Sequence, residues 1–230
     1  MTAFWIALQF LTTFPVQLKA MPTPQQNGQS LLFYPVVGLM IGVILFAIAS
    51  VLHAVPIVLL SSVILVIWIW LTGGLHLDGL ADTADAWVGG FGDAERTLKI
   101  MKDPACGPIG VLSLIIICIL KWSAIYLLLQ KQMYIALLLF PVLGRVAPLV
   151  LFLTTNYVRA KGLGSSIAST MPRKSAWLLV MVIVCGSFYF SWLGLIACMS
   201  MLIGLWYLRR KFIQRIGGIT GDTVGASIEI

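Results

Sequence analysis

Long apolar runs occupy most of this chain, and no acidic residue lies inside any of them. The runs cover residues 31–52, 56–71, 109–129, 133–154 and 176–208. About 20 apolar residues in an α-helix are enough to cross the ~30 Å hydrocarbon core of a bilayer. A mean hydropathy of +1.02 and a charged fraction of 10% are far from those of a soluble domain. The sequence therefore predicts an all-α, polytopic integral membrane protein with a single membrane-embedded domain over residues 1–230.

The apolar runs predict about six transmembrane helices. The last run is too long for one untilted span, so it is predicted to break into two short helices near Ser191. Residues 1–18 are apolar but short for a span, which favours a short N-terminal interfacial or re-entrant helix that ends at Pro15. Residues 20–29 are predicted to form a polar loop, and residues 156–174 a basic loop that contains glycines.

The basic residues predict how the chain is oriented. An even number of predicted spans separates any two of the larger polar segments, which therefore share one side. These segments are residues 19–30, 73–108, 156–175 and 209–230. Most of the 15 lysines and arginines lie on that side, which the positive-inside bias assigns to the cytoplasm. We therefore expect a multi-pass protein of the cell (inner) membrane, and the net charge of +7 then reflects topology rather than a nucleic-acid partner.

All but two of the eight acidic residues lie within residues 73–103. If this stretch is helical, Asp78, Asp82 and Asp85 fall at i, i+4 and i+7, which places three carboxylates on one face. No basic residue stands three or four positions after any of them. A cluster of oxygen ligands suits a hard cation, so the stripe predicts a Mg²⁺ site before a zinc or copper site.

A simpler interpretation of the same stretch is a solvated loop whose acids pair with Arg96, Lys99 and Lys102. Asp93 with Arg96 and Glu95 with Lys99 have the spacing of helical ion pairs. Asp93 and Glu95 are therefore interpreted as structural. Asp78, Asp82 and Asp85 remain the candidate metal ligands.

Three further charged or titratable residues are candidates for function. Lys121 and Arg145 lie inside apolar runs, where a cation is unfavourable by a few kcal/mol unless it is paired or snorkels to an interface. Contact with an anionic substrate and snorkelling both remain open for them. His76 lies two residues before Asp78. It is a candidate base, a hydrogen-bond donor to a phosphate or a simple polar loop residue.

The C-terminal segment holds the other two acids, Asp222 and Glu229, which would share one face of a helix. The glycines around Thr220 would let it and Asp222 form a tight turn close to a phosphate or a metal. The sequence GLGSS at residues 162–166 is a weaker phosphate-binding signal.

Four motifs in order along the chain resemble the cobalamin synthase family, the adenosylcobinamide-GDP ribazoletransferases. They are GGLHLDGLADTADAW, RTLKIMKDPACGPIGV, YVRAKGLG and GGITGDTVGA. The resemblance implies a membrane transferase of the phosphotransferase type that joins adenosylcobinamide-GDP to α-ribazole, or to its 5'-phosphate. GMP is released, Mg²⁺ is the cofactor, and the reaction belongs to the last steps of cobalamin nucleotide-loop assembly.

The family's site residues carry over onto matching positions of this sequence. The resemblance, with the residue pattern above, implies catalytic roles for His76, Asp78, Asp82, Asp85, Arg96 and Lys102, of which the three aspartates hold the metal. It implies substrate-binding roles for Thr220, Gly221 and Asp222, to which the intramembrane Arg145 is added. Either His76 or an aspartate free of metal would accept the proton of the attacking hydroxyl. Family members continue into another apolar segment after the last motif, so a final helix is expected beyond Ile230.

Two alternatives remain, of which one is a second kind of enzyme and the other is from another functional class. A CDP-alcohol phosphotransferase also places carboxylates at helical spacing, and Asp78 followed by Gly79 fits it, but LADTADAW lacks the alanine–arginine step of that motif. A divalent-cation transporter would place coupling carboxylates near the bilayer midplane, where the predicted spans have none. The sequence leaves homo-oligomer formation open.

Overall fold

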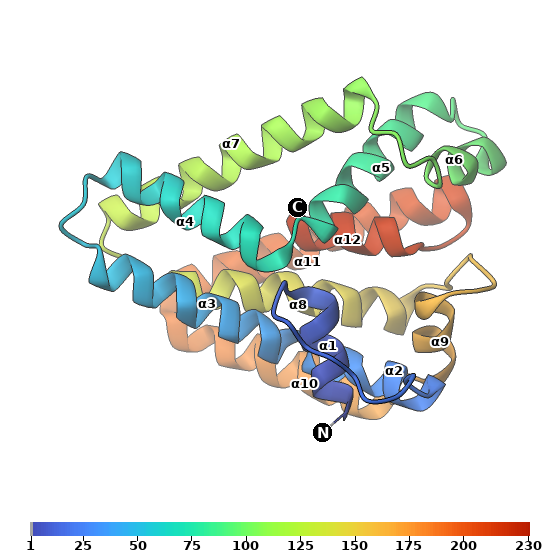
Figure 1. Cartoon of the computed structure of the whole chain (residues 1–230), viewed down its shortest axis with the longest axis horizontal. Coiled ribbons are helices and arrows are strands. Elements are labelled where there is room, and N and C mark those ends of the chain that lie inside the picture. Colours follow the sequence, from blue (N-terminus) through green and yellow to red (C-terminus); the bar gives the residue numbers. More distant parts are fainter. Residues whose placement is uncertain (1) are drawn as a thin grey trace.

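The computed structural model describes residues 2–230, and these residues form helices that run mostly along the long axis of the molecule (Figure 1). The helices are α1 (Thr2–Leu11), α2 (Pro24–Ser30), α3 (Tyr34–Val51), α4 (Ile57–Thr72), α5 (Leu75–Gly89), α6 (Ala94–Ile100), α7 (Pro108–Gln130), α8 (Ala136–Thr154), α9 (Leu163–Thr170), α10 (Arg173–Ser187), α11 (Ser191–Ile216) and α12 (Gly221–Glu229). The β-structure within residues 2–230 is one isolated parallel bridge between Tyr157 and Ile219. The prediction of an all-α membrane protein is confirmed.

Four helical segments are long and apolar enough to cross a membrane, or up to five if α4 and α5 are one bent span. The predicted number of about six is higher because it divides the last apolar run in two. That run is a 44-residue helical segment, Arg173–Ile216. Its backbone breaks at Ser191, where φ is +56°, so the predicted position of the break is confirmed. Gly194 fits against this break because a Cβ there would lie only 1.8 Å from the Ser187 carbonyl oxygen.

The central span of the bundle is α8, which packs against α3, α10, α11 and α12. Gly38 and Gly42 of α3 lie directly on the α8 backbone, since a Cβ at these positions would be 2.5 Å and 2.8 Å from the carbonyl oxygens of Pro141 and Leu137. Small residues let two membrane helices approach closely and gain dispersion contacts. By contrast, most of α7 faces outward, toward the expected lipid.

A sharp bend separates α4 from α5. Gly73 and Gly74 have φ values of +62° and +70°, a conformation that glycine adopts without a steric penalty. The two helices consequently meet at 87°. The acidic helix α5 leaves the direction of α4 and packs against α7 and α12. With 15 residues and three aspartates, it is not a spanning helix on its own.

Several predicted loops contain helix, which corrects the sequence interpretation. Residues 20–29 include α2, because Thr23 and Gln26 form a reciprocal capping box and Pro24 opens the first turn. The basic loop at residues 156–174 includes α9. Residues 209–216 continue α11, since no helix breaker occurs before Gly217, where φ is +75°. At the N-terminus, α1 is short as predicted but ends at Leu11 rather than Pro15.

Parts of the four segments predicted to share one side lie together at one end of the molecule (Figure 1). Figure 1 shows α2, α6 and α9 at the same end of the bundle, and α2 contacts α9 while α6 contacts the end of α11. We refer to this as the polar end of the molecule. The acidic residues of α5 and the start of α12 belong to it.

Candidate active site

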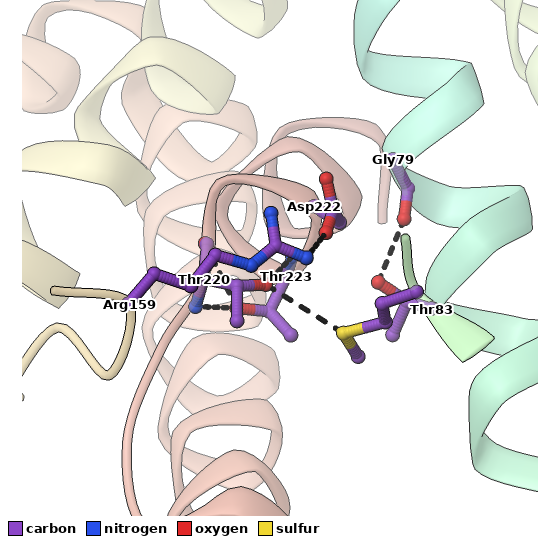
Figure 2. A network of polar contacts seen from close by, with 7 residues as sticks. Gly79, Thr83, Arg159, Thr220, Asp222 and Thr223 are labelled. Atoms are coloured by element: carbon purple, nitrogen blue, oxygen red, sulfur yellow. Dashed lines mark hydrogen bonds and ion pairs between the residues drawn. The ribbon is translucent and has the colours of Figure 1, made fainter. Parts of the chain in front are cut away.

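The two acidic motifs meet where α5 crosses α12. Gly79 of α5 lies against the α12 backbone, because a Cβ there would be 2.9 Å from the carbonyl oxygen of Asp222. Gly225 makes the reciprocal contact, with its Cβ position 3.5 Å from the Cα of His76. Figure 2 shows Gly79 and Thr83 facing this first turn of α12. Glycine at both crossing points therefore brings the aspartates of α5 close to Asp222.

Asp82 lies at the centre of a cluster of carboxylates. Burial, followed by the charges of Asp78, Asp222 and Asp85, raises the pKa of Asp82 to about 6, while Arg159 opposes the shift. Asp78 is exposed, and Asp82 and Asp85 are half-buried. The predicted helical stripe of aspartates is thus present. The negative charges of its neighbours make ionisation of Asp82 less favourable.

The cluster is not a preformed cage for a metal ion. Among residues 2–230, no three His, Cys, Asp or Glu side chains are close enough together to hold one. Mg²⁺ commonly binds through only one or two carboxylates and completes its shell with water and substrate phosphates. The oxygen donors and the excess of negative charge around Asp82 fit an ion of this kind, and they do not fit zinc, which favours nitrogen and sulfur ligands.

Asp85 has a contact that its spacing did not predict. Its carboxylate accepts hydrogen bonds from the backbone N–H groups of Gly107 and Gly110, at 2.7 Å and 2.8 Å. Gly107 is the N-cap residue of α7, and Gly110 lies in its first turn, where the backbone N–H groups have no earlier carbonyls to bind. Asp85 therefore fastens the second half of α5 to the start of α7, whether or not it also binds a metal.

The contact around Asp85 predicts that Gly110→Ala destabilises the protein. A Cβ at Gly110 would lie 2.4 Å from an Asp85 carboxylate oxygen, so helix α7 or Asp85 must move. We expect a loss of about 1–3 kcal/mol, the usual range for overpacking, measured by thermal unfolding in detergent. Gly204→Ala in α11 is the matched control, since no atom lies within 4 Å of its Cβ position. Equal melting temperatures for the two variants would contradict the prediction.

A second connection positions Arg159 at the cluster. The segment after α8 pairs with the segment after α11, with Val158 N–H donating to Ile219 and Ile219 N–H to Asn156, at 3.0 Å and 2.9 Å. Beyond this bridge, Arg159 Nη2 donates to Asp222 Oδ2 at 2.5 Å (Figure 2). Burial raises the pKa of Asp222, and Arg159 partly offsets that effect. Arg159 was not among the predicted site residues. It lies in the motif YVRAKGLG, one of the four motifs that carry the family resemblance, so the motif could have indicated it.

Thr220 begins α12 and is fully buried. Its hydroxyl accepts from Thr223 N–H at 3.2 Å, and Thr220 N–H donates to the Thr223 hydroxyl at 2.8 Å, which is a capping box. The Thr220 hydroxyl also lies 3.7 Å from the sulfur of Met101. Of the predicted substrate-binding residues in this motif, Thr220 thus has a capping contact, whereas Gly221 is exposed and Asp222 half-buried at the open start of the helix.

The basic residues of the acidic stretch form no ion pair with the carboxylate cluster among residues 2–230. Arg96 and Lys102 are exposed, and the Arg96 guanidinium lies 5.0 Å from the centre of the Phe91 ring. Neither of the predicted side-chain ion pairs, Asp93 with Arg96 or Glu95 with Lys99, occurs among the ion pairs of residues 2–230. Asp93 instead caps α6 by accepting from Arg96 N–H at 2.6 Å. It is structural, as predicted, but through a backbone contact.

A buried polar cluster lies on the other side of α5. Lys121 of α7 pairs with Glu229 at the end of α12, and His76 Nδ1 lies 3.7 Å from Glu229 Oε1. Arg145 is only 1% exposed, and its Nε and Nη2 have no hydrogen-bond partner within residues 2–230. None of the predicted spans contains an acid, but α12 carries Glu229 from the polar end down to Lys121.

A cavity of about 320 Å³ opens between α1, α3, α5, α8, α9 and α12, and we call it the α5–α9 cavity. Asp78, Asp222, Arg159 and Lys161 line it together with His76. A larger apolar groove of about 510 Å³ lies between α7, α8 and α11, with Lys121 and Glu229 in its wall. Arg145 lines neither of these two spaces, so the structure does not bring it to the aspartates.

Comparisons with known proteins agree with the motif resemblance. The family model described as cobalamin-5-phosphate synthase matches residues 3–230. A protein of Acinetobacter baumannii (strain ATCC 17978) named adenosylcobinamide-GDP ribazoletransferase is 60% identical over 230 residues, which are 100% of this chain and 93% of that protein. Proteins of the same name from Pseudomonas fluorescens (strain Pf0-1) and Stutzerimonas stutzeri (strain A1501) are 50% and 49% identical, over 100% and 98% of this chain and 95% and 92% of the relatives. No solved structure matches the chain.

Proposed function

The chain belongs to the cobalamin-5-phosphate synthase family, and from this membership we propose that it joins adenosylcobinamide-GDP to α-ribazole, or to its 5'-phosphate, with release of GMP. It is an enzyme, a transferase of cobalamin biosynthesis, as the identity to its relatives over the whole chain indicates. The proposed products are adenosylcobalamin or its 5'-phosphate. The reaction would complete the nucleotide loop of the cofactor.

The observation that carries this proposal is the meeting of the aspartate cluster, Arg159 and a nucleoside-sized cavity at one place. In the proposed reaction, a ribose hydroxyl attacks the phosphorus next to cobinamide, and GMP leaves. Little covalent chemistry is required of the protein in such a transfer, which depends on orienting two reactants and neutralising phosphate charge. A small cavity with carboxylates and an arginine beside it is suited to orienting the reactants and neutralising phosphate charge.

Mg²⁺ is the proposed cofactor, with Asp78 and Asp82 as its main protein ligands. Both lie on the open side of α5, and the charges around Asp82 favour binding of a cation. Asp85 has both oxygens engaged with α7 and would contribute only through its remaining lone pairs. When bound, Mg²⁺ would neutralise pyrophosphate charge and polarise the phosphorus under attack.

The chain's own groups would bind the phosphates and orient the acceptor. Arg159 and Lys161 line the cavity, and the open start of α12 at Gly221 presents backbone N–H groups, which favour anions. The exposed Arg96 and Lys102 are proposed to steady the remaining phosphate charge.

The proton of the attacking hydroxyl is proposed to pass to an aspartate of the cluster whose carboxylate does not bind the metal. The aspartates of the cluster reach the solvent side of the site. His76 is only 3% exposed and lies on the inner side of α5, next to Glu229. Its proposed contribution is contact with the acceptor.

The proposal predicts Mg²⁺-dependent GMP release. Purified protein in detergent or lipid vesicles, supplied with adenosylcobinamide-GDP and α-ribazole, should form GMP and the cobalamin product in equal amounts. Chelation of divalent ions should stop the reaction, and added Mg²⁺ should restore it. Both products are measured by chromatography. Absence of GMP with an active relative as the positive control would contradict the proposal.

Family membership leaves the alternatives without support. A CDP-alcohol phosphotransferase would release CMP from CDP-diacylglycerol in the same preparation, and a transporter would carry metal ions into sealed vesicles without substrate turnover. The polar end is proposed to face the cytoplasm across the inner membrane, because the basic residues gather there.

A further inference from the structure

We propose that the α5–α9 cavity is the binding site for the base of the acceptor, the 5,6-dimethylbenzimidazole ring of α-ribazole. This assignment rests on the proposed function and adds a substrate subsite to it. Three features of the cavity carry the assignment: its size and depth, its aromatic walls, and a buried histidine without a hydrogen-bond partner.

The size and depth of the cavity determine which part of the reacting molecules can fit into it. A volume of about 320 Å³ admits a nucleoside, at the small end of the range of about 300–1,000 Å³ for ligand pockets. The corrin ring is far too large to enter. Of the residues that line the cavity, Asp78 is exposed and His76 is buried, so the space leads from the polar end into the protein. A nucleoside in it would place its base inward and its ribose toward the aspartates.

The walls of the cavity suit a flat apolar ring. The Phe152 and Tyr157 rings stack 5.9 Å apart at 16°, and the Phe10 and Tyr34 rings stack 6.3 Å apart at 25°. All four line the cavity. Tyr157 keeps its position because Gly164 has no side chain, since a Cβ there would lie 2.3 Å from the Tyr157 ring. Aromatic walls stack well on a planar base.

The buried histidine distinguishes dimethylbenzimidazole from guanine, the bases of the two nucleosides in the proposed reaction. Neither ring nitrogen of His76 has a hydrogen-bond partner within residues 2–230, although the residue is only 3% exposed. A neutral imidazole offers one N–H donor, and an unpaired buried donor is unfavourable. Dimethylbenzimidazole has one ring nitrogen free to accept this hydrogen bond and no donor of its own. Guanine would bury several donors and acceptors against apolar side chains such as Leu75, Ile167 and Val224.

The proposal is tested by direct binding of α-ribazole to the whole protein, without adenosylcobinamide-GDP and without Mg²⁺. Binding is measured by calorimetry or by benzimidazole fluorescence. Leu163→Trp, which fills the cavity, should weaken α-ribazole binding at least about tenfold. Leu193→Trp, a matched change in the apolar groove, should leave the affinity unchanged. GMP should not compete with α-ribazole.

A second measurement isolates His76. The α-riboside of 5,6-dimethylindole has the same shape but lacks the accepting ring nitrogen, so the parent protein should bind it about tenfold more weakly than α-ribazole. His76→Phe should abolish that difference. Three results would overturn the assignment: no measurable binding of α-ribazole by the parent, equal affinity in Leu163→Trp, or competition by GMP. Failure of the proposed function would show separately, as α-ribazole binding without GMP release from complete reaction mixtures.

Discussion

Asp82→Ala is expected to slow GMP release by about 10²–10³-fold or more, the usual effect of removing one electrostatic stabiliser of a transition state. Asp82 lies at the centre of the carboxylate cluster, where the charges of Asp78 and Asp222 act on it most strongly. Its loss removes a ligand from the proposed cation site and leaves pyrophosphate charge uncompensated. Single-turnover release of GMP from adenosylcobinamide-GDP measures the effect on the transfer step itself.

The control for Asp82→Ala is Glu95→Ala, because Glu95 is an acid of the same stretch but lies exposed on α6. It should retain the parent rate. Both variants should insert in membranes and unfold at temperatures close to that of the parent. If folded Asp82→Ala protein turns over at the parent rate, Asp82 does not hold a catalytic cation.

Glu229→Ala is expected to lower the free energy of unfolding by about 3–5 kcal/mol, as is typical when one partner of a buried ion pair is removed. Glu229 is 7% exposed, and its carboxylate pairs with Lys121. Alanine would leave the Lys121 ammonium without its partner inside the bundle, and Arg145 would lose the negative charge of Glu229 that acts on it. Thermal or denaturant unfolding in detergent measures the loss.

The double variant Lys121→Met, Glu229→Met separates this effect from simple loss of packing. It removes both charges and keeps side-chain volume, so it should recover most of the stability that Glu229→Ala loses. A double variant no more stable than Glu229→Ala would mean that the pair itself is not the source of the effect.

The spans were predictable because their signal is local. Apolar runs without acids determine α3, α4, α7 and α8 within a few residues, and the break at Ser191 follows from run length alone. The helices at the polar end were missed where propensity and charge suggested loops. In α2, a capping box between Thr23 and Gln26 outweighed the polar composition. The basic end of α11 continued the helix because its lysines and arginines are good helix formers.

The site was predictable in part. Helical spacing correctly placed the aspartates of α5 on one helix, but it gave no information about what each would contact. The capping of α7 by Asp85, the pairing of Arg159 with Asp222 and the depth of Glu229 all depend on contacts between distant segments. Sequence periodicity reports the face of a helix and not the partner across from it. The metal ligands and catalytic roles remain predictions.

The parallel bridge between the ends of α8 and α11 sets where this part of the chain tolerates insertions. Side chains alternate along an extended segment, so one extra residue between Tyr157 and Arg159 would shift Arg159 by ~3.3 Å and turn it away from Asp222. An extra residue beside Gly162, which lies beyond the bridge with a φ of +117°, leaves the alternation intact. Between Tyr157 and the start of α9, a change of length that keeps the contact between Arg159 and Asp222 is therefore expected beside Gly162.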